Sequence, residues 1–157
     1  MLNLVLIDGN SLLNRAFYAN KHLTTKSGIP TNAVFGFTKL LLKIIGDIKP
    51  DRLIVTFDLK GPTFRHKMYD GYKATRKPMP EGLVVQVPEL KKLLSSMGVC
   101  MLEKAGYEAD DLIGTLSRKF PETQTLIYTG DRDSYQLIDS HTTVCMTKRG
   151  VSDLERL

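Results

Sequence analysis

Cysteine is scarce in this sequence, with only Cys100 and Cys145 among 157 residues. Both lie within apolar runs, so the sequence excludes a disulfide framework and a zinc site built from several thiolates. Reduced thiols are typical of proteins in the cytoplasm. We therefore expect a cytoplasmic protein.

Long hydrophobic runs are also missing. Residues 40–45 form the longest apolar stretch, and Lys43 interrupts it. Residues 1–7 are too short to cross a membrane and show no basic leader. We expect no membrane association.

The composition is that of a folded globular protein with a weakly basic surface. Apolar residues make up 42% of the chain, which is enough to form a hydrophobic core. Lys and Arg number 22 against 17 Asp and Glu, giving a formal net charge of +5. This charge favours an anionic partner without identifying one.

Short apolar segments alternate with amphipathic ones along the chain. Five segments rich in Val, Ile and Leu have the pattern of strands buried on both faces: residues 2–7, 52–57, 99–102, 125–129 and 143–147. Apolar residues recur at helical spacing in residues 10–20, 34–45, 88–97 and 109–120. Thr31 can cap the second of these helices. Gly46 and Pro50 are expected to end the second helix, and Gly98 the third. The alternation predicts one α/β domain, residues 1–157, with a mainly parallel central sheet and helices on both faces.

Residues 60–80 break this alternation. The segment holds three prolines, two glycines, six Lys or Arg and a single acid, Asp70, with Tyr69 and Tyr72 among them. It is longer than an ordinary connection in a compact domain. We interpret it as a mobile excursion or a binding element.

Acidic residues follow the predicted strands. Asp8 ends the first strand and Asp58 the second, and the next two strands are followed by Glu108, Asp110, Asp111, Asp131 and Asp133. In an open parallel sheet, the carboxyl ends of the strands and the helix starts that follow them form the crevice where ligands bind. The sequence therefore predicts that seven carboxylates converge at one edge of the sheet.

Converging carboxylates repel one another. Two like charges about 4 Å apart repel by about 4 kcal/mol at an effective dielectric constant of about 20. Protonation of some carboxyls or binding of divalent cations would neutralise them. Because these motifs contain no His or Cys, the donor set is all oxygen, which favours Mg²⁺ or Mn²⁺ over zinc or copper. Each acid taken alone also has a plainer interpretation as a turn or helix-cap residue.

Basic residues surround the predicted acidic cluster. Without the seven acids, the chain carries 22 basic and 10 acidic residues, a formal charge of +12. The basic residues of the excursion are suited to neutralise phosphates, and they are Lys60, Arg65, Lys67, Lys73, Arg76 and Lys77. Tyr72 is suited to stack on a base. A solvated loop is the alternative, but the position of the segment directly after Asp58 favours nucleic-acid binding.

Four motifs follow one another along the chain. They are Ile7-Asp8-Gly9-Asn10-Ser11-Leu12, continuing to Arg15-Ala16-Phe17; Phe57-Asp58, followed by Pro62-Thr63-Phe64-Arg65 and Tyr72-Lys73-Ala74-Thr75-Arg76; Tyr107-Glu108-Ala109-Asp110-Asp111; and Thr129-Gly130-Asp131-Arg132-Asp133. In this order they resemble the 5′-3′ exonuclease domain found at the N-terminus of bacterial DNA polymerase I. The likeness covers nearly the whole chain, and four motifs in order are far more specific than any one alone.

The resemblance implies a PIN-like, flap-endonuclease-type fold with a basic arch segment at about residues 60–85. It implies a bacterial, nucleoid-associated enzyme that acts during DNA replication and repair. The implied substrates are DNA with a 5′ flap or 5′ end and RNA/DNA primer junctions. The implied cofactors are two Mg²⁺ or Mn²⁺ ions, which together activate a water and steady the leaving oxygen, so that no side-chain nucleophile is required.

The resemblance also assigns roles to individual residues. One metal site would be held by Asp8, Asp58, Glu108 and Asp110, and a second by Asp131 and Asp133, with Asp111 as a helper. The scissile phosphate and the threaded 5′ strand would be held by Tyr72, Lys73 and Arg76, with further phosphate contacts from Arg15 and Arg65.

One departure from the family concerns the end of the sequence. The family continues into a helix-three-turn-helix segment that grips duplex DNA and supplies further aspartates, whereas this sequence stops at Leu157. The second metal site would then lack ligands, and we expect weakened or lost activity in this chain alone. We interpret the chain as a fragment or a shortened form, with a polymerase domain as the implied partner in a full-length protein.

Two other classes of function stay open. A noncatalytic nucleic-acid-binding module would keep the fold and the basic face but cut nothing. A phosphoacceptor signalling domain also places acids at strand ends, with a late lysine that would here be Lys148. The motif at residues 107–111 and the basic excursion fit the phosphoacceptor class poorly.

Overall fold

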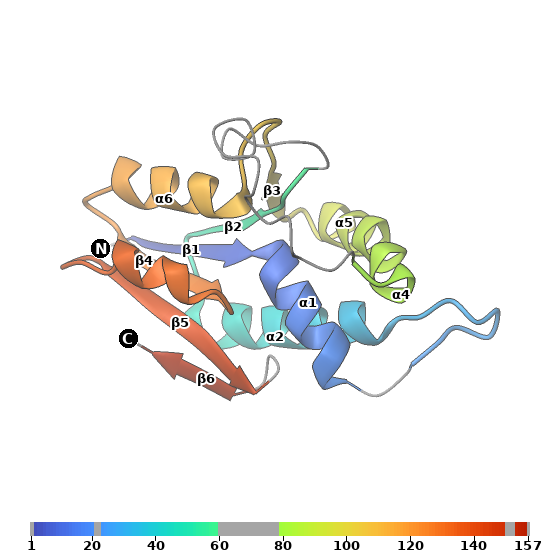
Figure 1. Cartoon of the computed structure of the whole chain (residues 1–157). Coiled ribbons are helices and arrows are strands. Elements are labelled where there is room, and N and C mark those ends of the chain that lie inside the picture. The colour runs from blue at the N-terminus through green and yellow to red at the C-terminus, as the bar shows by residue number, and fades with distance from the viewer. Residues whose placement is uncertain (1, 21–22, 60–78, 150–152, 157) are drawn as a thin grey trace.

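The structure is a computed structural model that describes residues 2–20, 23–59, 79–149 and 153–156 (Figure 1). Its elements in chain order are β1 (Asn3–Asp8), α1 (Gly9–Ala19), α2 (Asn32–Ile48), β2 (Arg52–Thr56), α4 (Glu81–Val84), α5 (Gln86–Ser96), β3 (Cys100–Leu102), α6 (Ala109–Lys119), β4 (Gln124–Thr129), the 3₁₀ helix η1 (Arg132–Leu137), β5 (Thr142–Arg149) and β6 (Asp153–Arg156). None of the described helices combines the length and apolar character needed to cross a membrane.

The sheet has six strands in the order β3-β2-β1-β4-β5-β6. The first five run parallel, and β6 pairs antiparallel with β5. The predicted α/β fold with a mainly parallel sheet is therefore confirmed. Strand β6 is not predicted from the sequence, because residues 153–156 lack an apolar run like those of the other strands.

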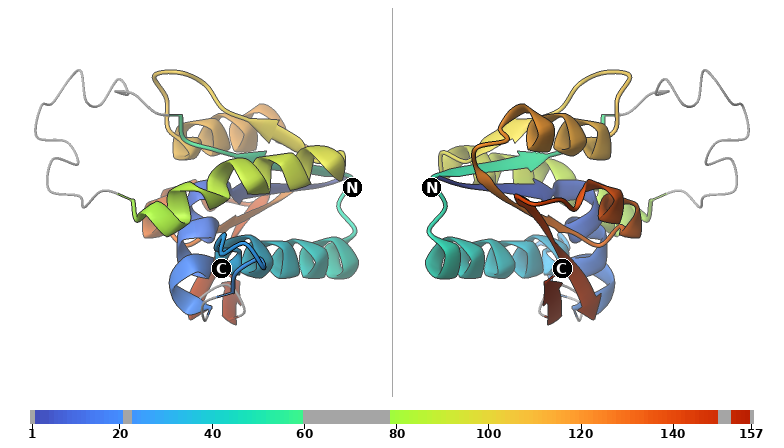
Figure 2. Two further views of the ribbon diagram at one scale, coloured as in Figure 1. Left: turned by 90° about the vertical axis from the view of Figure 1, so that its right-hand side faces the viewer. Right: turned by 90° about the vertical axis from the view of Figure 1, so that its left-hand side faces the viewer.

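Helices cover both faces of this sheet. Figure 2 shows α6 on one side of the strands and α2 on the other. The larger hydrophobic core joins α1, α2 and α5 to one face, with Phe37, Leu41 and Leu90 among its buried side chains. The smaller core joins α6 and η1 to the opposite face, where Ile113 is fully buried. Both faces of the central strands are thus shielded from water, as parallel sheets require.

The alternation of side chains along β1 decides which face carries its terminal acid. Val5 and Ile7 belong to the core under α1 and α2, whereas Leu4 and Leu6 belong to the core under α6. Because successive side chains of a strand point to opposite faces, Asp8 falls on the α6 face.

A buried glutamine caps helix α2 in place of the residue expected from the sequence. Thr31 occupies the N-cap position, but its side chain makes no capping hydrogen bond. Instead, Gln86 Oε1 accepts hydrogen bonds from the backbone N–H groups of Ala33 at 2.8 Å and Val34 at 3.1 Å. The Gln86 amide also donates to Asn32 Oδ1 at 2.9 Å. The side-chain cap expected of Thr31 is therefore wrong, because a distant glutamine satisfies the same N–H groups.

The expected helix ends are close to those found. Helix α2 continues two residues beyond Gly46 and ends at Ile48, where Lys49 adopts a left-handed conformation with φ 50° and Pro50 follows. After α5, Gly98 takes φ +74°, a conformation that a residue without a Cβ adopts readily.

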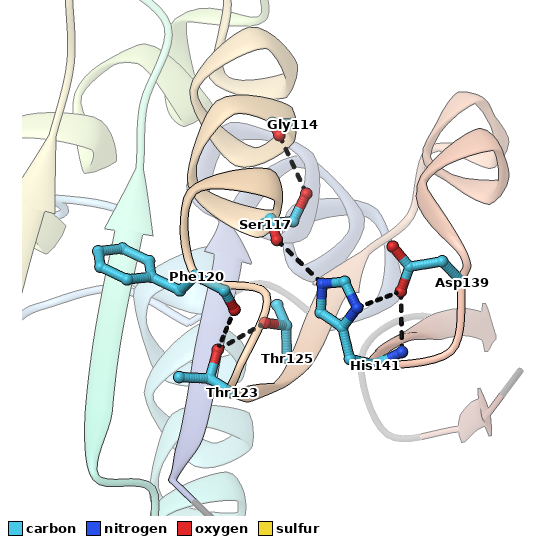
Figure 3. A network of polar contacts seen from close by, with 7 residues as sticks. All are labelled: Gly114, Ser117, Phe120, Thr123, Thr125, Asp139 and His141. Atoms are coloured by element: carbon cyan, nitrogen blue, oxygen red, sulfur yellow. Dashed lines mark hydrogen bonds and ion pairs between the residues drawn. The ribbon is translucent and has the colours of Figure 1, made fainter.

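His141 contacts the carboxyl-terminal end of α6 at the edge of the sheet opposite the acids (Figure 3). His141 Nδ1 lies 3.1 Å from Asp139 Oδ1, and its Nε2 lies 3.4 Å from the carbonyl oxygen of Ser117. The backbone N–H of His141 also donates to Asp139 Oδ1 at 2.9 Å, and this bond is the main cause that lowers the pKa of Asp139. These contacts hold α6 against the sheet.

We expect Gln86→Leu to lower the free energy of unfolding by about 2–4 kcal/mol, because it leaves the buried N–H groups of Ala33 and Val34 without an acceptor. Urea denaturation followed by circular dichroism measures this loss. The exposed Gln136 provides the control, since Gln136→Leu should change the same quantity by less than about 0.5 kcal/mol. Equal effects of the two substitutions would contradict the capping role.

Candidate metal centre

A cleft of about 930 Å³ opens at the carboxyl edge of the sheet. Six of the seven predicted acids line it: Asp8, Asp58, Glu108, Asp110, Asp131 and Asp133. The seventh, Asp111, lines an adjoining cleft that shares Glu108, Asp110 and Asp133 with the first. The structure therefore brings together acids from four separate segments of the chain.

Asp8 connects β1 to α1 and faces the cleft. Its Oδ1 accepts a hydrogen bond from the Ser11 backbone N–H at 3.1 Å, and its Oδ2 accepts one from the Thr129 hydroxyl at 3.3 Å. The next residue, Gly9, has no room for a side chain, because a Cβ would lie 2.7 Å from both the Phe57 ring and the Thr56 carbonyl oxygen. Only 4% of Asp8 is exposed, so its carboxyl group is held in a crowded, nearly dry turn.

Asp58 joins the end of β2 to the start of α6. Its Oδ1 accepts a hydrogen bond from the Ala109 backbone N–H at 2.6 Å. Its own backbone N–H donates to Asn10 Oδ1 at 2.8 Å, which ties it to the turn after β1. Asp58 thus lies on the α6 face, like Asp8.

The acids at the start of α6 serve partly as helix caps. Glu108 and Asp111 form a reciprocal capping box, in which Asp111 Oδ2 accepts the Glu108 backbone N–H at 2.9 Å. The plainer interpretation as a cap therefore describes Asp111 well. A helper role for Asp111 at a metal remains a prediction.

Two side chains of α1 hold the turn after β4 through hydrogen bonds. The Gly130 backbone N–H donates to Ser11 Oγ at 2.9 Å, and Arg15 donates to the Gly130 carbonyl oxygen at 2.8 Å. Asp131 then caps η1 by accepting the Asp133 backbone N–H at 2.9 Å. Because Arg15 holds this turn, its predicted phosphate contact would have to act beside that structural role.

Asp110 has a strongly perturbed carboxyl group. Its Oδ1 atom is buried and has no hydrogen-bond donor among the described residues. Burial, followed by the neighbouring carboxyl group of Asp8 and then that of Asp131, raises the pKa of Asp110 to about 8. Burial, with added repulsion from Asp58 and Asp131, also raises the pKa of Asp8 to about 6. Both pKa values are thus raised by the same cause, which is burial beside other carboxyl groups.

The donor set fits a hard divalent cation. Among the described residues, six carboxylates and no His or Cys line this cleft, and carboxylate oxygen is the donor that Mg²⁺ and Mn²⁺ prefer. Asp110 lines the same cleft, and its Oδ1 is an acceptor without a hydrogen-bond donor among the described residues. Within the described residues, no group of three or more His, Cys, Asp or Glu side chains is already arranged as a ligand cage, so the carboxylates would have to close around an ion.

Sequence reasoning missed three polar residues that hold the acids in place. Asn10 and Ser11 bind the turns after β2 and β4, and the buried Thr129 hydroxyl bridges Asp8 and the backbone N–H of Asp131. All three lie inside the quoted motifs, so their polar character beside the acids was the available signal. Four further predicted site residues lie outside the described part of the chain: Arg65, Tyr72, Lys73 and Arg76.

We expect the free energy of unfolding, measured in EDTA, to fall between pH 5 and pH 7 by on the order of 2 kcal/mol for each extra proton that the folded state holds. In the folded protein the pKa is raised from 3.8 to about 8 for Asp110 and to about 6 for Asp8. The folded protein therefore keeps protons that the unfolded chain has already released, so a rise in pH lowers the free energy of unfolding. Urea titrations of the wild type and Asp110→Asn at both pH values test this. The wild-type decrease should exceed that of the variant, and identical pH dependence would contradict the assignment.

A known protein family matches nearly the whole chain. The family model described as the 5′-3′ exonuclease, N-terminal resolvase-like domain matches residues 3–156. DNA polymerase I of Caldicellulosiruptor bescii is 46% identical over 145 residues, which cover 91% of this chain and 17% of that protein. DNA polymerase I of Bacillus subtilis is 41% identical over 154 residues, 97% of this chain and 18% of that protein. The chain thus spans less than a fifth of the length of these relatives.

Solved structures share the fold. The T5 5′-exonuclease with bound divalent metal ions (zinc) superposes with a TM-score of 0.70 at 18% identity, covering 99% of this chain and 57% of that one. The T5 flap endonuclease in a pseudo-enzyme-product complex with DNA and metal ions gives a TM-score of 0.63 at 17% identity, covering 90% and 54%. The predicted PIN-like α/β fold is confirmed. With the match over nearly its whole length, the chain belongs to the family of 5′-3′ exonuclease N-terminal, resolvase-like domains.

Proposed function

We propose that this chain forms the metal-binding part of a 5′-3′ exonuclease or 5′ flap endonuclease that hydrolyses phosphodiester bonds of DNA and RNA primers. The observation that carries the proposal is the convergence of carboxyl groups from four chain segments on one cleft, where Asp110 Oδ1 has no hydrogen-bond donor among the described residues. The family membership and the DNA-bound structure of the T5 flap endonuclease support it.

The cleft residues divide into two groups of proposed Mg²⁺ or Mn²⁺ ligands. The first group is Asp8, Asp58, Glu108 and Asp110, and the second is Asp131 and Asp133. Bound cations in such a centre lower the pKa of water and stabilise the leaving oxygen of an in-line displacement. The Thr129 hydroxyl and the Asn10 amide orient the ligands, through their hydrogen bonds to Asp8 and to the Asp58 backbone.

Positive charge beside the cleft is needed to bind a polyanion near these acids. We assign this role to Lys73 and Arg76, which would contact the scissile phosphate, with Tyr72 stacking on a base of the 5′ strand and Arg65 as a further phosphate contact. Such charges stabilise a phosphoryl group most where water is excluded. We assign a further phosphate contact to Arg15, which lies within the described residues and lines the cleft.

We expect Asp110→Asn to reduce cleavage of a labelled 5′ flap duplex in Mg²⁺ or Mn²⁺ by about 100-fold or more, because it removes a proposed ligand. A gel assay of the product measures the rate. Asp47→Asn alters an exposed acid on α2 and should leave the rate unchanged, which controls for loss of negative charge. EDTA should abolish cleavage. A wild-type chain that binds the flap duplex in Ca²⁺ but never cuts it would favour the noncatalytic binding module instead.

The matched relatives are much longer than this chain, and we propose that their following region completes the second group of ligands and grips the duplex. A longer protein that includes this region should cut flap DNA faster, and with stronger preference for flap over single-stranded substrate, than residues 1–157 alone. Side-by-side cleavage assays at equal concentration measure both quantities. Equal rates and equal preference would contradict this account.

A further inference from the structure

A second groove runs from the acids along helix α6. This α6–η1 groove has a volume of about 1270 Å³, and residues from both helices line it, including Thr115, Arg118 and Gln136. It shares Glu108, Asp110, Arg132 and Asp133 with the cleft of the metal centre. The two depressions therefore meet at the carboxylates, with α1 flanking one and α6 flanking the other.

Cationic side chains line this groove beyond the acids. They are Lys104, Arg118, Lys119 and Arg132, and all four are exposed. Lys104 Nζ lies 5.1 Å from the centre of the Tyr107 ring, and Lys119 Nζ lies 6.0 Å from that of Phe120. Within the described part of the chain, neither Arg118 nor Arg132 forms an ion pair with a carboxylate. Both guanidinium groups are thus available to an anionic ligand.

The spacing of the charges suits a phosphate backbone. Arg118 follows Asp110 by eight residues on α6, which corresponds to about 12 Å along the helix axis. One strand of a duplex carries a phosphate about every 3.4 Å of its axis, so this length corresponds to roughly three to four phosphates. Arginine binds phosphate oxygens through two parallel N–H groups.

We propose that the α6–η1 groove is a second nucleic-acid subsite, an inference that rests on the proposed function. Arg118 and Arg132 bind backbone phosphates of the substrate there, on the side of the metal centre away from α1. The plainer role of Arg118 is to stabilise the carboxyl-terminal end of α6, where cations interact favourably with the helix dipole. The two roles differ in a measurable way, because only a phosphate contact contributes to the salt dependence of nucleic-acid binding.

The test compares Arg118→Ala with Arg52→Ala, which removes an exposed arginine at the start of β2 that does not line the groove. Fluorescence anisotropy of a labelled 5′ flap duplex, and of the flap strand alone, is recorded in Ca²⁺ over a series of salt concentrations. Arg118→Ala should weaken binding about three- to tenfold at low salt. The slope of log affinity against log salt should become less negative, by about 0.9 if the groove holds duplex and about 0.7 if it holds single strand.

The conservative variant separates charge from structure. Arg118→Lys should retain most of the wild-type slope, whereas Arg52→Ala should retain both slope and affinity. Melting temperatures of all variants are recorded, and weakened binding that follows only a lowered melting temperature would overturn the subsite. Equal binding by Arg118→Ala and Arg52→Ala, whether both unchanged or both weakened, would also overturn it.

Wild-type cleavage in Mg²⁺ separates failure of this subsite from failure of the proposed nuclease. If the wild type cuts flap DNA while Arg118→Ala and Arg52→Ala bind alike, only the subsite fails. If the wild type binds without cutting and Arg118→Ala alone weakens binding, the subsite stands and the nuclease fails. A wild type that neither binds nor cuts would overturn both.

Discussion

Side chains of a strand point alternately to the two faces of a sheet, and this alternation determines where the acids of this protein lie. Val5 and Ile7 must enter the core under α1 and α2, so Asp8 is directed to the face that α6 covers. Val55 of β2 and Phe57 just after it impose the same choice on Asp58, whose carboxyl group meets the first turn of α6. A shift of one residue in either strand would bury the apolar set on the wrong side and remove the acid from the cleft.

The acids that the alternation brings together are also part of the local backbone structure. Asp8 caps α1, Glu108 and Asp111 cap α6, and Asp131 caps η1. Each cap satisfies N–H groups that a helix start leaves unpaired. The proposed ligands are therefore fixed in position by hydrogen bonds that the fold needs in any case. Two proposed ligands are exceptions: the buried Oδ1 of Asp110 serves no cap and has no donor among the described residues, and Asp133 takes part in these caps only through its backbone N–H.

The sequence was informative where the signal is local. Apolar runs gave the five parallel strands, and Gly98 gave the end of α5, because periodicity and a left-handed turn depend on a few adjacent residues. The acids were placed at one edge by a single topological rule, that of parallel strands with right-handed crossovers.

Signals between distant residues could not be read in this way. The capping of α2 by Gln86 joins residues more than fifty positions apart, and no pattern in the sequence distinguishes that glutamine from an exposed one. Arg15 appeared as a phosphate contact, whereas in the structure it also holds the Gly130 turn. The α6–η1 groove depends on how two helices pack on one face, which becomes visible only when both are placed.

The hydrogen bonds around the cleft form a chain of constraints that links four turns. Asn10 holds Asp58, Asp58 holds Ala109, and both Ser11 and Arg15 hold Gly130. Since the backbone on all sides is restrained before any ligand arrives, the entropy of ordering these turns is lost during folding. Binding of an ion would then call for side-chain adjustments instead of rearrangement of these turns, as in a preorganised centre.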